Sequence, residues 1–348
     1  MSSLDELIDK TIPANIRLKE PLALPEAMTE YEFGQHIAAL AAKNKLYTTY
    51  IGMGWYNTVT PAVIQRNVFE NPVWYTSYTP YQTEVSQGRL EALLNFQTAV
   101  CDLTGMPLAN CSLLDEATAA AEAVTMMYAL RPRDMQKSGA NVVFVDESVF
   151  PQTLAVVTTR AIPQGIQIRT GKYDETELTP DTFACIVQYP NAGGNIEDYR
   201  AFVEKAHAAG CKVAVAADIL SLALLTPPGE WGADIVFGTT QRLGTPMFYG
   251  GPSAAYFATR DEYKRNMTGT HHRLVPKTNT ENCATAWRCK PANSTSNARR
   301  PLPTSVPHRH CWPRWQASMP YTTGRKASAP LPDASTASPH SWNRKSIN

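Results

Sequence analysis

Residues 212–252 read "KVAVAADILSLALLTPPGEWGADIVFGTTQRLGTPMFYGGP", and this stretch decides the fold. Two short apolar runs, 212–218 and 234–239, each end in polar or glycine-containing sequence, as buried β-strands do. Comparable runs are "NVVFVD" (141–146), "FACIVQYP" (183–190) and "PSAAYFAT" (252–259). Alternation of such strands with helices predicts an α/β fold with a doubly wound, mostly parallel sheet. Ligand sites in such folds lie at the carboxyl ends of the strands.

The chain is expected to consist of four segments. Residues 1–45 are predicted to be helical, with Ser3 as an N-cap. Residues 46–89 form an aromatic, loop-rich segment, and long loops of this kind often carry recognition groups. Residues 90–267 form the large domain, in which helices are predicted at 90–104, 112–130 and 195–210, the last ending at Gly210. Residues 268–348 form a tail.

The tail differs in composition from the rest of the chain. It contains 12 Lys and Arg against 2 Asp and Glu, whereas residues 1–267 contain 20 against 29. It has no Phe and only 7 Leu, Ile, Val or Met among 81 residues. This is too little apolar side chain to offset the entropy of ordering it, so the tail is expected to be disordered.

The compartment is expected to be the cytoplasm. Seven Cys show no regular framework that would indicate disulfides. The N-terminus "MSSLDELIDK" is acidic and unlike a signal peptide, and no apolar run is long enough to span a membrane.

The loop before the helix at 112–130 is the first candidate site. Ser112 precedes a helix whose first-turn amides suit a phosphate. Asp115 and Glu116 in that turn already complement the helix dipole and would repel an anion. A simply capped helix is therefore the favoured interpretation.

Two further candidates follow strands. Asp218 ends a strand where a carboxylate is placed to meet a ligand such as a pyridinium nitrogen; capping of the next turn explains it equally well. Gln241 and Arg242 follow the next strand, where a cofactor enzyme using pyridoxal phosphate would carry its Schiff-base lysine. Arginine stays protonated and cannot serve as that nucleophile. No catalytic residue is therefore assigned.

The chain resembles a known family over residues 1–267. The resemblance is carried by "YIGMGWYNTVTPAVIQRNVFENPVWYTSYTPYQTEVSQGRLEALLNFQTAVCDLTG", "SLLDEATAAAEA", "PPGEWGADIVFGTTQRLGTPMFYGGP" and "ATRDEYKRNM". These segments are similar to the N-terminal half of glycine dehydrogenase (decarboxylating), the P-protein of the glycine cleavage system. The resemblance implies two homologous halves of the aspartate aminotransferase type, in one chain or two subunits, and an oligomer.

The resemblance also implies a function. The family decarboxylates glycine on pyridoxal phosphate and transfers the aminomethyl group to the lipoyl arm of H-protein. The C-terminal half carries the lysine and binds most of the cofactor; Arg242 falls where that half has its lysine. Asp218 matches the position of the aspartate at the pyridine nitrogen, and the loop at Ser112 matches the phosphate loop. The resemblance therefore makes vestigial candidates of Ser112, Asp218, Gln241 and Arg242. This half would place loops beside the partner half's active site. The residues chosen for that role are Tyr56, Asn57, Thr58, Tyr75, Tyr78 and Tyr81.

The tail is interpreted as an out-of-frame translation. The family continues after "EYKRNM" with Pro-Gly-Arg-Ile-Ile, and residues 268–273 can be written in codons that encode these amino acids when read one base later. Residues 298–317 resemble the family in another register, so a second slip is expected near Val275 or Pro276. A stop codon met out of frame would make the chain a fragment, inactive by itself.

Other interpretations of the tail are weaker. Its Lys and Arg are scattered among Pro and Trp rather than arranged in a stripe, so a nucleic-acid arm is not expected. A zinc site from Cys283, Cys289, His308, His310 and Cys311 lacks the usual paired spacing, so no metal is expected.

Two alternatives to an inactive fragment remain. One is a non-catalytic subunit that pairs with a separately encoded catalytic half. The other is an autonomous pyridoxal-phosphate enzyme using Lys172 or Lys212.

Overall fold

The computed structural model describes residues 1–20, 22–75, 82, 85–247, 253–268, 270–276 and 283–289, the last two ranges for their backbone only. The chain divides into two compact units, Met1–Tyr50 and Ile51–Asn348.

The first unit contains two helices, α1 (Leu4–Thr11) and α2 (Glu30–Ala41). Ser3 caps α1 as predicted, its side chain accepting a hydrogen bond from the Glu6 amide at 3.2 Å. Thr29 and Glu32 form a reciprocal capping box at the start of α2. The segment between the helices is non-helical where the structure describes it, and it holds prolines at 13, 21 and 25, which have no amide to donate.

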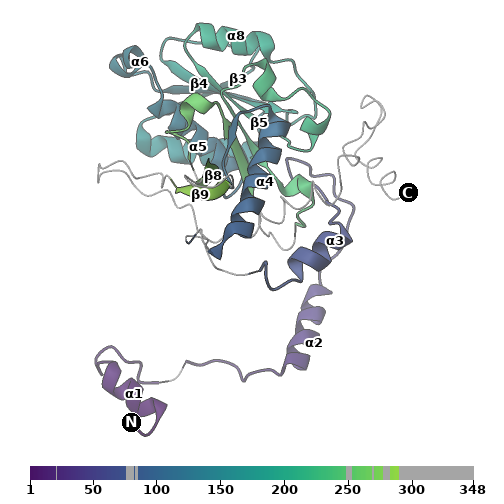
Figure 1. Cartoon of the computed structure of the whole chain (residues 1–348), viewed down its shortest axis with the longest axis vertical. Helices are drawn as coiled ribbons and strands as arrows, with labels where there is room; N and C mark the ends of the chain where they lie inside the picture. The colour runs from purple at the N-terminus through teal and green to yellow at the C-terminus, as the bar shows by residue number, and fades with distance from the viewer. Residues whose placement is uncertain are drawn as a thin grey trace. The chain divides into compact units, whose positions relative to one another are not determined.

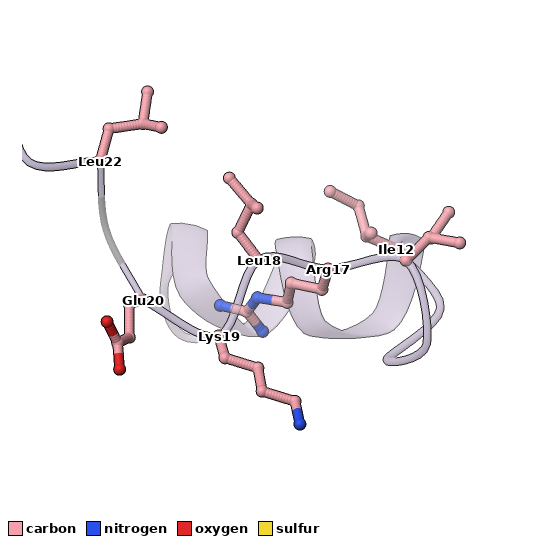
Figure 2. A pocket seen from close by; sticks show the side chains of 7 residues that line it. Ile12, Arg17, Leu18, Lys19, Glu20 and Leu22 are labelled. Atoms are coloured by element: carbon pink, nitrogen blue, oxygen red, sulfur yellow. The ribbon is translucent and has the colours of Figure 1, made fainter.

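A shallow pocket lies in the first unit beside α1. Figure 2 shows Leu18 and Leu22 pointing to one side of the chain, and Lys19 and Glu20 to the other. The pocket is lined by Ile12, Ile16, Arg17, Leu18, Lys19, Glu20 and Leu22, all of them exposed. These side chains offer no buried polar group, so the pocket is not a candidate catalytic site.

The second unit is built on a seven-stranded sheet with strand order β1-β7-β6-β5-β4-β2-β3. Strands β3, β2, β4, β5 and β6 are parallel, whereas β7 and β1 pair antiparallel. The predicted mostly parallel sheet is therefore confirmed. The strands are β1 (Leu108–Ala109), β2 (Val142–Asp146), β3 (Gln167–Gly171), β4 (Thr182–Tyr189), β5 (Lys212–Ala217), β6 (Ile235–Thr239) and β7 (Ala255–Thr259).

Both faces of the sheet are covered by helices, which is why its strands are almost wholly apolar. Helices α5 (Glu116–Ala129) and α7 (Pro151–Ala161) pack on one face. Helices α4 (Gln87–Thr104) and α8 (Arg200–Ala208) pack on the other, and α4 runs alongside the sheet in Figure 1. The remaining short elements are α3 (Ala62–Ile64), η1 (Gln65–Phe69), α6 (Arg133–Ser138), η3 (Ile162–Gln164), η4 (Ser221–Ala223), η5 (Pro228–Trp231), η6 (Gln241–Leu243) and η7 (Asp261–Tyr263).

Two strands lie in the segment that was expected to be disordered. The backbones of β8 (Thr270–Pro276) and β9 (Cys283–Cys289) pair antiparallel, and their Cα atoms come within 8 Å of those of α4. The rest of the tail beyond these strands lies outside the described residues. The first residue of the tail is fixed to the core, because the Thr268 hydroxyl donates to the buried Glu122 carboxylate at 2.8 Å.

Residues 51–60 form an extended segment with alternating exposure. Even-numbered residues are half-buried and odd-numbered residues are exposed, as on a strand with one face against a core. The segment begins with a turn in which Gly52, Met53 and Gly54 all have positive φ. A positive φ is strained for a non-glycine residue such as Met53, and it persists only where contacts with neighbouring residues stabilise it.

Candidate functional site

Three elements meet at the carboxyl end of the sheet. Asp218 follows β5, Gln241 and Arg242 form η6 directly after β6, and α5 begins nearby. The carboxyl of Glu116, the first residue of α5, is surrounded by Asp218, Asp115, Gln188 and the Thr239 backbone. The edge of the sheet expected to hold the site therefore brings the strand-end and helix-start candidates together.

The Asp218 carboxylate makes two contacts within the chain. Its Oδ2 lies 3.3 Å from Arg242 Nε, and its Oδ1 accepts the Leu220 amide at 3.0 Å. The pair is only about a quarter exposed. The capping interpretation of Asp218 agrees with its bond to the Leu220 amide, whereas a contact with a pyridinium nitrogen stays a prediction.

The start of α5 is a capped helix, as favoured from the sequence. Asp115 is the N-cap, and its Oδ1 accepts the Thr118 amide at 2.7 Å. Ser112 is turned to its own backbone and donates to the Leu113 carbonyl at 3.1 Å. A carboxylate therefore occupies the amide-lined helix end that an incoming phosphate would use.

Glu116 adds a second carboxyl at this helix end. Its Oε1 is fully enclosed and has no hydrogen-bond partner, although the residue as a whole is half-buried. The pKa of this carboxyl is raised to about 7, mainly by burial and also by the nearby Asp218 and Asp115, while hydrogen bonding from the Thr239 backbone and Gln188 lowers it.

The raised pKa of Glu116 makes stability pH-dependent. The unfolded carboxyl titrates near 4.5 and the folded one near 7. The folded state therefore binds a proton that the unfolded state has lost, and the free energy of unfolding falls as pH rises between these values. The loss is complete above pH 7, at about 3 kcal/mol. Urea unfolding at pH 5 and pH 8 should show this slope in the wild type but not in Glu116→Gln. The exposed Glu91→Gln is the control; an unchanged slope in Glu116→Gln would refute the assignment.

Gln241 and its neighbours hold the extended segment described above. Gln241 is fully buried, and its Nε2 donates to the carbonyls of Tyr56 and Thr245, each at 3.0 Å. Thr58 donates to the Thr245 carbonyl at 3.0 Å, and Thr60 donates to the Gly244 carbonyl at 2.8 Å. Two stretches separated by more than 180 residues are thereby joined.

Arg242 completes this connection. Its guanidinium carbon lies 4.5 Å from the centre of the Tyr56 ring, within the range of a cation–π contact. The same side chain faces Asp218, so one arginine links the end of β5 to the extended segment.

The six residues chosen from the aromatic segment have different environments. Tyr56 and Thr58 face their own unit, whereas Asn57 is exposed. Tyr75 is 60% exposed. Tyr78 and Tyr81 lie outside the described residues.

The residues at this edge do not fit pyridoxal phosphate. Position 242 holds an arginine instead of a lysine, this arginine pairs with Asp218, and the carboxylates of Asp115 and Glu116 lie at the helix start where a phosphate would bind. The two alternative lysines lie elsewhere. Lys212 is the first residue of β5, at the opposite end of the strand from Asp218, and bonds Tyr263. Lys172 follows the edge strand β3 and is bonded to Glu175.

Restoring a lysine should not restore cofactor binding. In Arg242→Lys, the new amine would pair with Asp218, and the carboxylates of Asp115 and Glu116 would still repel a phosphate. After treatment with pyridoxal phosphate and borohydride, peptide mass spectrometry should find no more label at position 242 than at the exposed Lys137. Preferential labelling of position 242 would contradict this prediction.

Sequence reasoning missed two features of the site. Glu116 was noted only as a first-turn acid, because the sequence does not show that its carboxyl is enclosed. Thr60 was not chosen, although Thr58 and Thr60 share the period of two that marks one face of an extended segment.

Other kinds of site are limited by what the structure describes. Among the described residues, no group of His, Cys, Asp or Glu is arranged to hold a metal ion. The side chains of the tail cysteines and histidines lie outside that part of the chain. Within the same described part, no helix combines the length and apolar composition needed to cross a membrane.

Comparison with known proteins identifies one family. The model of the family described as "Glycine cleavage system P-protein" matches residues 1–295. Proteins named glycine dehydrogenase (decarboxylating) from Bacteroides fragilis and Bacteroides thetaiotaomicron are 85% and 84% identical over 269 residues. In both, the match covers 77% of this chain but 28% of the relative, so the chain spans little more than a quarter of their length.

A solved structure agrees with the sequence matches. The crystal structure of a glycine decarboxylase (P-protein) of the glycine cleavage system, in inhibitor-bound form, superposes with a TM-score of 0.81 at 30% identity. The superposition covers 94% of this chain and 74% of that chain.

Proposed function

Because the chain belongs to the family of glycine cleavage system P-proteins, we propose that it is the N-terminal portion of a glycine dehydrogenase (decarboxylating). The observation that carries this proposal is 85% identity to the Bacteroides fragilis enzyme over 269 residues. The activity is the decarboxylation of glycine on pyridoxal phosphate, with transfer of the aminomethyl group to the lipoyl arm of H-protein.

In this proposal the chain contributes no catalytic group of its own. Support comes from the carboxyl edge of the sheet, where the Asp218–Arg242 pair and the Asp115 cap occupy the places of a cofactor. The cofactor is held mainly by the C-terminal half, to which this half presents residues of segment 46–89. The complete enzyme is an oligomer in the cytoplasm.

The test compares two proteins. One is this chain alone; the other joins residues 1–267 to the remaining sequence of the Bacteroides fragilis relative. Exchange of labelled carbon dioxide into glycine should require pyridoxal phosphate and occur only in the joined protein, with lipoylated H-protein stimulating it. Exchange catalysed by the chain alone, or its absence from the joined protein, would contradict the proposal.

A second candidate is a non-catalytic subunit paired with a separately encoded catalytic half. It is favoured by the solved P-protein structure. This chain covers 74% of that chain but only 28% of the Bacteroides fragilis relative, so P-protein chains shorter than this relative exist. Co-purification of the chain with the product of a neighbouring gene that carries the lysine would support this candidate.

The four segments proposed from the sequence include an out-of-frame tail after Met267. Support comes from the Bacteroides alignments, whose 269 residues nearly equal the length of the body. The family-model match, by contrast, extends past Met267 to residue 295 and therefore includes β8 and β9. The DNA across codons 260–345 should contain one base slip near codon 267 and another near codon 276; an intact reading frame would refute the proposal.

A further inference from the structure

We propose that the degenerate cofactor edge now serves as an anchor: Gln241, Arg242 and the carbonyls of residues 244–245 position residues 56–60 for the active site of the catalytic half. This inference rests on the proposed function, and it gives the residues at the lost lysine position a new role.

The anchor consists of contacts to the even-numbered residues of the segment. Tyr56 is held through its carbonyl by Gln241 and through its ring by Arg242. Thr58 and Thr60 donate to the Thr245 and Gly244 carbonyls. Three successive inward-facing residues are thus each tied to the loop after β6, and this fixes the register of the segment.

The anchor also fixes which residues face outward. A shift of one residue in an extended segment exchanges its two faces. With Tyr56, Thr58 and Thr60 held inward, Trp55 and Val59 are 42% and 63% exposed, and Asn57 is exposed between them. Two apolar side chains flanking one amide are therefore presented in a defined order to whatever lies opposite.

The preceding turn is held as well. Gln152, near the start of α7, donates to the Met53 carbonyl at 2.8 Å, and the Phe150 ring lies against Gly54. A Cβ at Gly54 would lie 3.0 Å from that ring, and its φ is +85°. Contacts at the turn and along residues 56–60 therefore restrict sliding of the segment relative to the loop after β6.

The residues of the anchor are those that a cofactor enzyme would use for its lysine and pyridine contacts. Gln241 and Arg242 occupy the lysine region, and Asp218 orients Arg242. Because Arg242 is neutralised by Asp218, it can face an aromatic ring without an unpaired charge. The same three positions therefore gain a structural task that depends on the absence of a cofactor.

The test removes two hydroxyls and keeps their shape. Thr58→Val with Thr60→Val deletes both hydrogen bonds, and Thr58→Ser with Thr60→Ser restores them. Thr159→Val, on the exposed face of α7, makes the same chemical change in a side chain that bonds only its own helix. The chain carrying each set is digested with chymotrypsin, and the cleavage rate after Tyr56 is followed by mass spectrometry. The valine pair should raise this rate about tenfold, because local opening exposes the bond; the serine pair and Thr159→Val should leave it unchanged.

The second readout uses the joined protein described above. The valine pair should lower kcat for glycine–carbon dioxide exchange about tenfold, with the cofactor absorbance retained and the KM for glycine changed less than threefold. The serine pair should restore kcat. Unchanged proteolysis would overturn the anchor, and faster proteolysis with normal kcat would overturn its role in positioning. An inactive wild-type joined protein would instead refute the proposed function, and this inference with it.

Discussion

Replacing Gly238 by alanine is expected to destabilise the second unit by about 3 kcal/mol or more, at the upper end of what overpacking costs. Gly238 lies in β6, and an added Cβ would be 2.2 Å from the Ala217 carbonyl oxygen and 2.9 Å from the Tyr256 ring. Neither neighbour can yield easily. Ala217 is the last residue of β5, and its carbonyl accepts the buried Tyr256 hydroxyl at 2.7 Å.

The consequence should reach the candidate site, because Asp218 follows Ala217 directly. Thermal unfolding of Gly238→Ala should show a melting temperature lower by about 10 °C. Gly171→Ala is the matched control: Gly171 also lies in a strand, as the last residue of β3, but its added Cβ would be an ordinary 3.6 Å from the Phe144 ring. Equal melting temperatures for the two variants would show that the backbone at Gly238 relaxes freely.

Asp234→Ala should have an effect of similar size at the opposite end of the sheet. Asp234 is 2% exposed and accepts hydrogen bonds from the Val213 amide at 2.8 Å and the Tyr263 hydroxyl at 3.0 Å. His207 lies 2.8 Å and Arg260 3.6 Å from its carboxylate oxygens. Removing the carboxylate leaves the buried Val213 amide and Tyr263 hydroxyl without this acceptor and His207 and Arg260 without their carboxylate partner, at a cost of about 3–5 kcal/mol.

Urea unfolding measures this loss. The control is Asp198→Ala, which breaks an exposed ion pair with Arg200 at 3.0 Å and should change the free energy of unfolding by less than about 1 kcal/mol. A loss below 1 kcal/mol in Asp234→Ala would mean that water or a rearranged side chain satisfies the abandoned donors.

The sheet was predictable because each of its central strands is a compact apolar run. β5 and β6 fall within one residue of the predicted ranges, and Gly210 follows α8 with a φ of +79°. β3 was missed because its sequence "QIRTG" is an exposed-edge strand without an apolar run. The helix predicted over 195–210 begins only at Arg200, since residues 191 and 195 bond one another in a turn.

The positions of the site residues were predictable from the sequence, but the contacts that these residues make were not. The sequence places Asp218 and Arg242 after neighbouring strands, and a parallel sheet brings such residues together. It does not reveal that Tyr56 and Thr58 are turned inward, since aromatic and hydroxyl side chains suit either face of an extended segment. That choice depends on hydrogen bonds to a loop almost 190 residues away, which no local pattern encodes.

The Asp218–Arg242 pair also bears on how folding depends on small molecules. A site that leaves a carboxylate facing an open cavity gains stability when a cation or cofactor binds, and its melting temperature then rises with ligand concentration. Here the countercharge is covalently part of the chain, present at a fixed ratio whatever the cell contains. The stability of the second unit is therefore not tied, through this carboxylate, to the concentration of any small molecule.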